Sequence, residues 1–152
     1  MVEARDLTDY KVELIEENIE RFQLNNMRAV RFDARQFDPK MEQTADVVIA
    51  DLPCSGLGVI ATKTDIKYNA SEEKIRSLAE LQREILSAVH RYVKSGGILM
   101  YSTCTISREE NQENLNWFLK EHPQFTLEQE LLFLPDEECD GFYIAKMKCL
   151  PQ

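Results

Sequence analysis

The chain has 152 residues, 43% of them apolar and 30% charged, a balance that is typical of a globular protein with a buried core. The net charge of −9, from 27 acidic and 18 basic residues, argues against a free-standing nucleic-acid binder, because neutralising phosphates needs a basic surface. No run of about 18 apolar residues and no basic-then-apolar leader occurs, so we expect a cytoplasmic protein without a membrane partner.

The first third of the chain predicts strands that alternate with a helix. Strands are predicted over residues 2–6, 27–32 and 45–49, from short runs of apolar residues. Thr8 is placed to cap the helix between the first two strands. Spacings of three and four residues predict that the core-facing stripe of this helix is Val12, Ile15, Ile19 and Phe22.

A long helix is predicted to begin at Ser71 and to end at Gly96-Gly97, which would turn the chain into a fourth strand at residues 98–100. The residues expected on its buried face are Ile75, Leu78, Leu81, Ile85, Leu86, Val89 and Val93. Ser107 and Glu110 have the S-x-x-E spacing of a capping box, which predicts a further helix after them.

Two more strands are expected, over residues 125–133 and 141–149. Helices that alternate with strands indicate the α/β class. No boundary interrupts the pattern, so we predict one domain over residues 1–152.

Two cysteine motifs follow the third and fourth predicted strands. They are Asp51-Leu52-Pro53-Cys54-Ser55-Gly56 and Tyr101-Ser102-Thr103-Cys104-Thr105. A helix joins the two strands, so the crossover should be right-handed and the strands parallel neighbours. The carboxyl ends of such strands share the edge where open α/β folds bind ligands. Asp51, Cys54 and Cys104 are therefore predicted to meet there.

Free cysteines are most often small buried apolar residues, and either one alone would be read in that way. Two of them in matched motifs favour thiol chemistry, and the helix predicted after Cys104 would favour a thiolate there. Cys139 and Cys149 lack such a context and are expected to be structural. The absence of a CxxC pair and of zinc-ligand spacing indicates no metal site, and no histidine lies near either motif to support redox or acyl-transfer chemistry.

Asp6 and Asp33 each follow a predicted strand, where nucleotide-binding folds use acids to hold ribose hydroxyls. The alternative is that each carboxylate bonds its own local backbone, as aspartates in turns often do. A cofactor site of this kind also needs a glycine-rich turn after its first strand, and none precedes Asp6. We therefore expect the first strand and its glycine loop to lie upstream of residue 1.

The motifs DLPCSGLG, YSTCT with SREENQENL, and DGFYIAK resemble those of RNA 5-methylcytosine methyltransferases of the Sun/Fmu/Nop family, most closely its bacterial RsmB-type ribosomal RNA branch. The resemblance covers residues 2–148. It implies a Rossmann-like S-adenosylmethionine-dependent methyltransferase fold with a mostly parallel sheet, here lacking its first strand and glycine-rich loop. It also implies a cofactor site, incomplete in this chain, at Asp6, Asp33 and Asp51.

The same resemblance implies the chemistry. Cys104 would add to carbon 6 of a cytosine, Asp51 would stabilise the ring at N3, and Cys54 would assist removal of the C5 proton and release of the RNA. Pro53 and Lys67 would contact the substrate, which is expected to be ribosomal RNA.

The resemblance places an RNA-binding domain upstream, which would supply the affinity that this acidic chain lacks. A non-catalytic remnant that acts as an interaction module is the alternative. The strands that end at Asp6 and Asp51 would flank the missing strand, so they should either close up or leave exposed edges for self-association.

Overall fold

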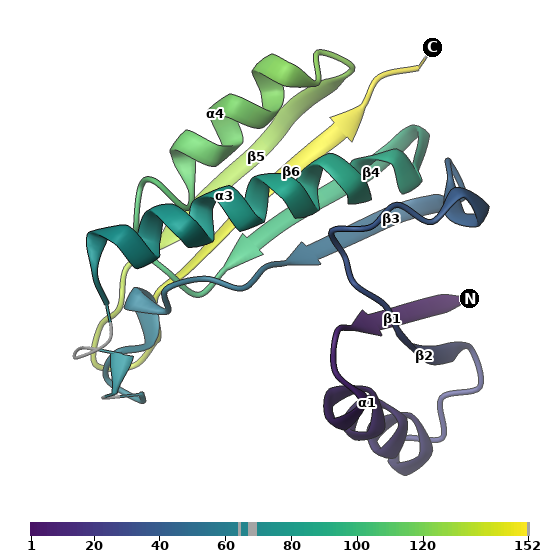
Figure 1. Cartoon of the computed structure of the whole chain (residues 1–152), viewed down its shortest axis with the longest axis horizontal. Helices are drawn as coiled ribbons and strands as arrows, with labels where there is room; N and C mark the ends of the chain where they lie inside the picture. The colour runs from purple at the N-terminus through teal and green to yellow at the C-terminus, as the bar shows by residue number, and fades with distance from the viewer. Residues whose placement is uncertain (64, 67–69, 152) are drawn as a thin grey trace. The chain divides into compact units, whose positions relative to one another are not determined.

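The computed structural model describes residues 1–63, 65–66 and 70–151, and the chain divides into two compact units, Met1–Phe37 and Asp38–Gln152. Each unit contains its own β-sheet (Figure 1). Strand β1 pairs with β2 and strand β3 with β4, so the strands that end near Asp6 and Asp51 belong to separate sheets. Within the described residues, no helix is long and apolar enough to cross a membrane.

The first unit consists of β1 (Val2–Asp6), α1 (Asp9–Arg21) and β2 (Met27–Arg31), with the two strands parallel. Thr8 caps α1 as predicted, since its hydroxyl accepts the Lys11 N–H. The inner stripe is only half-buried, and Phe22 is 62% exposed. The prediction for Phe22 was wrong because the helix stops at Arg21, which leaves Phe22 as its cap residue.

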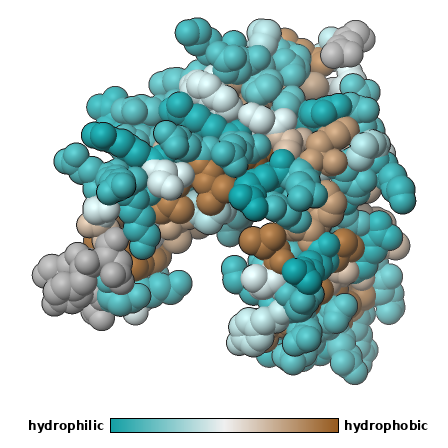
Figure 2. Space-filling model, viewed as in Figure 1, coloured by the Kyte–Doolittle hydropathy of each residue, from teal (hydrophilic) through white to brown (hydrophobic). Residues whose placement is uncertain are grey.

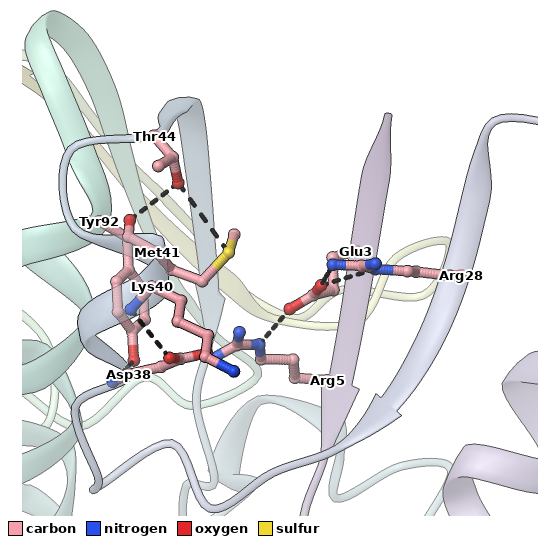
Figure 3. Close-up of polar contacts among 8 residues, drawn as sticks. All are labelled: Glu3, Arg5, Arg28, Asp38, Lys40, Met41, Thr44 and Tyr92. Carbon is pink, nitrogen blue, oxygen red and sulfur yellow. Dashed lines mark hydrogen bonds and ion pairs between the residues drawn. The ribbon is translucent and has the colours of Figure 1, made fainter.

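Glu3 joins the two strands of this unit (Figure 3). It lies opposite Arg28 in the parallel register and accepts from the Arg28 Nε at 2.7 Å, and it also pairs with Arg5. Burial by itself would raise the pKa of Glu3, but the hydrogen bonds from Arg5 and Arg28 outweigh it and hold the pKa below its ordinary value. The contact between Glu3 and Arg28 therefore favours the parallel register of β1 and β2.

The second unit has a four-stranded sheet in the order β3-β4-β6-β5. The strands are β3 (Ala45–Asp51), β4 (Val93–Thr103), β5 (Phe125–Phe133) and β6 (Phe142–Cys149). β3 and β4 are parallel neighbours, and β6 is antiparallel to both β4 and β5. Among these described strands only β6 is reversed, which confirms the mostly parallel α/β sheet.

Helices α3 (Glu72–Val89) and α4 (Gln112–Glu121) cover one face of this sheet (Figure 1). Ser71 caps α3 as predicted, by accepting the Lys74 N–H. Leu86 of α3, Phe118 of α4 and Leu99 of β4 are fully buried in the layer between helices and sheet. The surface over the two helices is mostly hydrophilic, as expected of amphipathic helices (Figure 2).

Asp38 connects the start of this unit to the turn that follows α3. Asp38 caps the 3-10 turn Pro39–Met41 by accepting the Lys40 N–H, and its own N–H donates to the Tyr92 hydroxyl at 2.9 Å (Figure 3). Tyr92 lies in the 3-10 turn His90–Tyr92 that follows α3. The entry to β3 is thus held beside the entry to β4.

Two boundary predictions were wrong. α3 ends at Val89, and Gly96-Gly97 lie inside β4, where Gly96 has a φ of +76° and the β3–β4 register shifts. A glycine pair allows a strand bulge as well as a helix end, and here it makes the bulge. The capping box is only half formed: Ser107 Oγ accepts the Glu110 N–H at 3.5 Å, but α4 begins later, with Asn111 as its cap residue, and the Glu110 side chain points inward.

Candidate active site

The two motif cysteines meet at the carboxyl ends of β3 and β4. Their sulfur atoms lie 3.2 Å apart although 50 residues separate them in the chain. Parallel pairing sets Asp51 opposite Ser102, and each cysteine lies a short step beyond. Both thiols are half-buried, so a ligand can reach them. The predicted convergence of Cys54 and Cys104 is confirmed.

The two thiols are not electrostatically equivalent. Burial raises the pKa of Cys54, and the hydrogen bond and negative charge of the neighbouring Cys104 raise it further, to about 12. Cys54 therefore keeps its proton near neutral pH and can donate it to the sulfur of Cys104.

Asp51 is the last residue of β3 and its side chain is exposed. Its Oδ1 accepts from the Ser102 hydroxyl at 2.9 Å, which fixes the carboxylate relative to the motif that carries Cys104. Within the described part of the chain, no group donates a hydrogen bond to the second carboxylate oxygen. Asp51 can therefore accept a hydrogen bond from a ligand at this edge.

Glu110 is a site residue that the sequence analysis missed. Its side chain is fully buried, and its carboxylate accepts both the backbone N–H of Ser55 (2.8 Å) and the Ser55 hydroxyl. The Ser55 oxygen is also 2.8 Å from the Thr105 hydroxyl. Because Ser55 follows Cys54 and Thr105 follows Cys104, this network connects the residues next to both thiols.

A buried glutamine extends the network under the motif. The Gln82 amide group donates to the Pro53 carbonyl (2.9 Å) and to Glu110 Oε1 (3.1 Å). Its oxygen accepts from Asn114 at 2.8 Å and lies 3.1 Å from the Tyr101 hydroxyl, which also donates to the Glu110 carbonyl. Burial raises the pKa of Tyr101 above its ordinary value, so this hydroxyl stays a donor. Gln82 is a polar residue on the otherwise apolar buried face of α3, and this pattern in the sequence could have indicated the network.

A third motif reaches the site through glycine. Gly58 donates its N–H to the carbonyl of Cys104 at 3.0 Å, and its own carbonyl accepts the N–H of Gly141 at 2.7 Å. A Cβ on Gly58 would lie 2.4 Å from the Gly141 oxygen, so no larger residue fits. Strand β6 also pairs with β4 at Thr103 and Tyr143, so the DGFYIAK segment is in backbone contact with both cysteine motifs.

The structure says less about the two residues predicted to contact the substrate. Pro53 is exposed and is held through its carbonyl, whereas Lys67 lies outside the described residues. A small pocket beside Ser55 includes Lys74, a cation that the sequence analysis did not single out. Among the residues that the model describes, no three His, Cys, Asp or Glu side chains are close enough together to hold a metal ion.

Asp6 and Asp33 belong to the first unit, and each makes local contacts. Asp6 Oδ1 accepts the Thr8 N–H at 3.1 Å, and Oδ2 is 3.6 Å from the exposed Lys11 ammonium. Asp33 is paired with Arg35 through both carboxylate oxygens, and the hydrogen bonds from Arg35 hold its pKa below the ordinary value. One carboxylate oxygen of Asp6 therefore makes only a long contact with Lys11, whereas both oxygens of Asp33 accept hydrogen bonds from Arg35.

The model of one protein family, described as 16S rRNA methyltransferase RsmB/F, matches residues 1–148. The chain belongs to this RsmB/F family. Probable ribosomal RNA small subunit methyltransferase B of Bacillus subtilis is 38% identical over 166 residues, which cover 97% of this chain and 37% of that protein. The chain spans about a third of the length of such curated relatives (34–37%).

Solved structures agree with the family. The crystal structure of PH0851 superposes with a TM-score of 0.89 at 31% identity, over 95% of this chain and 36% of that one. NSun6 from Pyrococcus horikoshii, solved with SFG, gives a TM-score of 0.81 at 27% identity, over 99% of this chain and 41% of that one. The thiol pair described above therefore lies in the methyltransferase fold of an RsmB/F member.

Proposed function

We propose that this RsmB/F chain is the catalytic part of an S-adenosylmethionine-dependent RNA methyltransferase that modifies carbon 5 of a cytosine, with ribosomal RNA as the substrate. The observation that carries the proposal is the 3.2 Å contact between Cys54 and Cys104, which belong to two motifs within the residues that match the family model. Residues 1–148 match one family model, which supports treating both units as parts of one catalytic domain.

Carbon 5 of cytosine is a poor nucleophile, and the proposed role of Cys104 is to activate it. Its thiolate forms a bond to carbon 6, and the C5–C6 π electrons move towards C5. Asp51 in its protonated form would donate a hydrogen bond, or the proton itself, to N3 of the ring and so stabilise the negative charge that develops there. The base must leave its stack to reach the thiols at the edge of the sheet.

Cys54 is proposed to act in the second half of the reaction. While Cys104 is an anion, its charge and hydrogen bond help to keep Cys54 protonated. Once the Cys104 sulfur is bonded to carbon, that charge is gone and Cys54 can lose its proton to solvent more easily. The Cys54 thiolate then takes the C5 proton, the C5–C6 double bond re-forms, and the Cys104 thiolate leaves.

S-Adenosylmethionine, when bound, supplies an electrophilic methyl group. NSun6 was solved with SFG, an analogue of this cofactor, which supports the assignment. Asp6 fits a role in binding ribose hydroxyls, because its Oδ2 is only weakly engaged by Lys11. Asp33 fits that role only if Arg35 releases its carboxylate.

The proposal is tested by trapping the covalent adduct. The chain is incubated with S-adenosylmethionine and a ribosomal RNA segment that contains 5-fluorocytosine, from which no C5 proton can be removed. We expect an adduct that survives denaturing electrophoresis, is lost in Cys104→Ala, and is kept in Cys54→Ala. With ordinary cytosine RNA, Cys54→Ala should accumulate adduct because release is blocked.

Titration calorimetry with S-adenosylmethionine serves as the matched control for cofactor binding. A chain that binds the cofactor but forms no adduct with either RNA would contradict the proposed chemistry. That result would favour the alternative of a non-catalytic interaction module.

A further inference from the structure

The buried carboxylate of Glu110 has no part in the chemistry proposed above, yet it is bound to the residue next to one thiol. It is fully buried, and its partners among the described residues are neutral groups: the Ser55 N–H, the Ser55 hydroxyl and the Gln82 amide. Removing a carboxylate from water is costly unless hydrogen bonds compensate for it, and these three donors do so.

The direction of the hydrogen bonds follows from the chemistry of the groups. A carboxylate can only accept, so the Ser55 hydroxyl donates to Glu110. The Ser55 oxygen is then free to accept the Thr105 hydroxyl proton, and the Thr105 oxygen itself accepts the Ser107 N–H at 3.2 Å. A single chain of donors therefore runs from the loop after Cys104 to Glu110.

We propose that Glu110 is a positioning residue, which fixes the backbone and side chain of Ser55 and thereby sets the distance between Cys54 and Cys104. Its contact with the Ser55 N–H holds the peptide that follows Cys54, and the Ser55–Thr105 contact holds the peptide that follows Cys104. The importance of this distance for catalysis rests on the proposed function, but the geometry can be tested without it.

The test measures how readily the two thiols form a disulfide at equilibrium with a glutathione buffer. In this reaction Cys54 and Cys104 give up two hydrogens and form one S–S bond, while oxidised glutathione becomes two reduced molecules. The equilibrium constant is the effective concentration of one thiol at the other, and peptide mass spectrometry identifies the pair that has formed. A loss of positioning should lower this constant by about tenfold or more.

Glu110→Ala and Ser55→Ala should both show that loss. Glu110→Gln should remain close to the parent chain, because one amide oxygen still accepts the Ser55 N–H and the amide group can donate to the Ser55 oxygen. Glu113→Gln is the matched control, since Glu113 is exposed in the first turn of α4 and should leave the constant unchanged.

A folded Glu110→Ala variant, as judged by circular dichroism, with the parent constant would overturn the proposal. If that variant does not fold, Ser55→Ala and Thr105→Val decide instead, and parent values in both would overturn it. The proposed function fails separately: a parent chain that binds S-adenosylmethionine and forms no RNA adduct, but whose thiol equilibrium depends on Glu110, refutes the methylation chemistry and keeps the positioning role.

Discussion

Gly141 donates its backbone N–H to the carbonyl oxygen of Gly58 at 2.7 Å, so the loop after β3 and the start of β6 are in direct main-chain contact. A methyl group on either glycine would meet backbone atoms of the other at less than 3 Å. Backbone atoms cannot rotate away as a flexible side chain can. This contact brings segments from three parts of the chain together at the thiol site.

Gly58→Ala is therefore expected to destabilise the chain by about 1–3 kcal/mol, the usual cost of overpacking. The new Cβ would lie 2.4 Å from the Gly141 oxygen and 2.9 Å from the Cys104 oxygen. Urea unfolding followed by circular dichroism measures the change. Gly96→Ala provides the comparison: it has open space around it and only a positive φ to strain, so its cost should be about 1 kcal/mol.

Gln82→Leu should cost about 3 kcal/mol or more, although leucine has a similar size and suits a helix. The substitution leaves the Pro53 carbonyl and the Asn114 amide without the partner they have in the buried network. Glu84→Gln, on the exposed side of the same helix, should be close to neutral. Equal unfolding midpoints for the two variants would contradict the account of Gln82 as the centre of the network.

Cys104→Ser should make Cys54 easier to ionise. The serine hydroxyl keeps the size of the side chain but carries no charge, so one cause of the high Cys54 pKa is removed while burial remains. The pKa should move from about 12 back towards its ordinary value, and alkylation by iodoacetamide at pH 9 should become faster. The exposed Cys139 is the internal control. An unchanged alkylation rate at Cys54 would mean that the charge of Cys104 does not contribute to its high pKa.

His122 should make the chain less stable in mild acid. Its ring lies 4.0 Å from the ring of His90, and burial together with the charge of His90 lowers its pKa to about 4. The unfolded chain then binds more protons than the folded one between pH 4 and 6.5, so stability falls as the pH drops through that range.

The size of the effect should be about 1 kcal/mol, because His122 is partly exposed and solvent screens the interaction. His122→Gln should flatten the pH dependence of the free energy of unfolding between these limits. The measurement is urea unfolding at several pH values on both proteins. Parallel curves for the two would show that other groups are responsible.

The parts of the fold that depend on periodicity and crossover rules could be predicted from the sequence. The caps at Thr8 and Ser71 depend on local sequence. The parallel β3–β4 pair and the meeting of the two thiols follow from the crossover topology. Glu110 could not be recognised in this way. Its spacing from Ser107 matches a helix cap, whereas its carboxylate binds Ser55, 55 residues away. A local motif cannot report a partner that distant.

The conformation of one glycine pair could not be predicted from the sequence for a related reason. Gly96-Gly97 could end a helix or make a strand bulge, and both use the same conformational freedom. In the structure α3 ends at Val89, earlier than its apolar pattern suggested, and the short turn His90–Tyr92 follows it, so the glycine pair falls inside β4. Asp6 and Asp33 show the limit on the functional side, since both make the local backbone contacts expected of any turn aspartate, and these contacts do not distinguish a nucleotide site from an ordinary turn.

The polar groups beneath the thiols have a consequence for the descent of such chains. These groups are Gln82, Tyr101, Glu110 and Asn114, and they hydrogen-bond with one another. Replacing one of them with a residue that cannot hydrogen-bond therefore leaves polar groups of its neighbours without a partner. Selection should remove single replacements of that kind. Lineages that differ at one of these positions should therefore differ at its neighbours as well. The four side chains are expected to be inherited as a set.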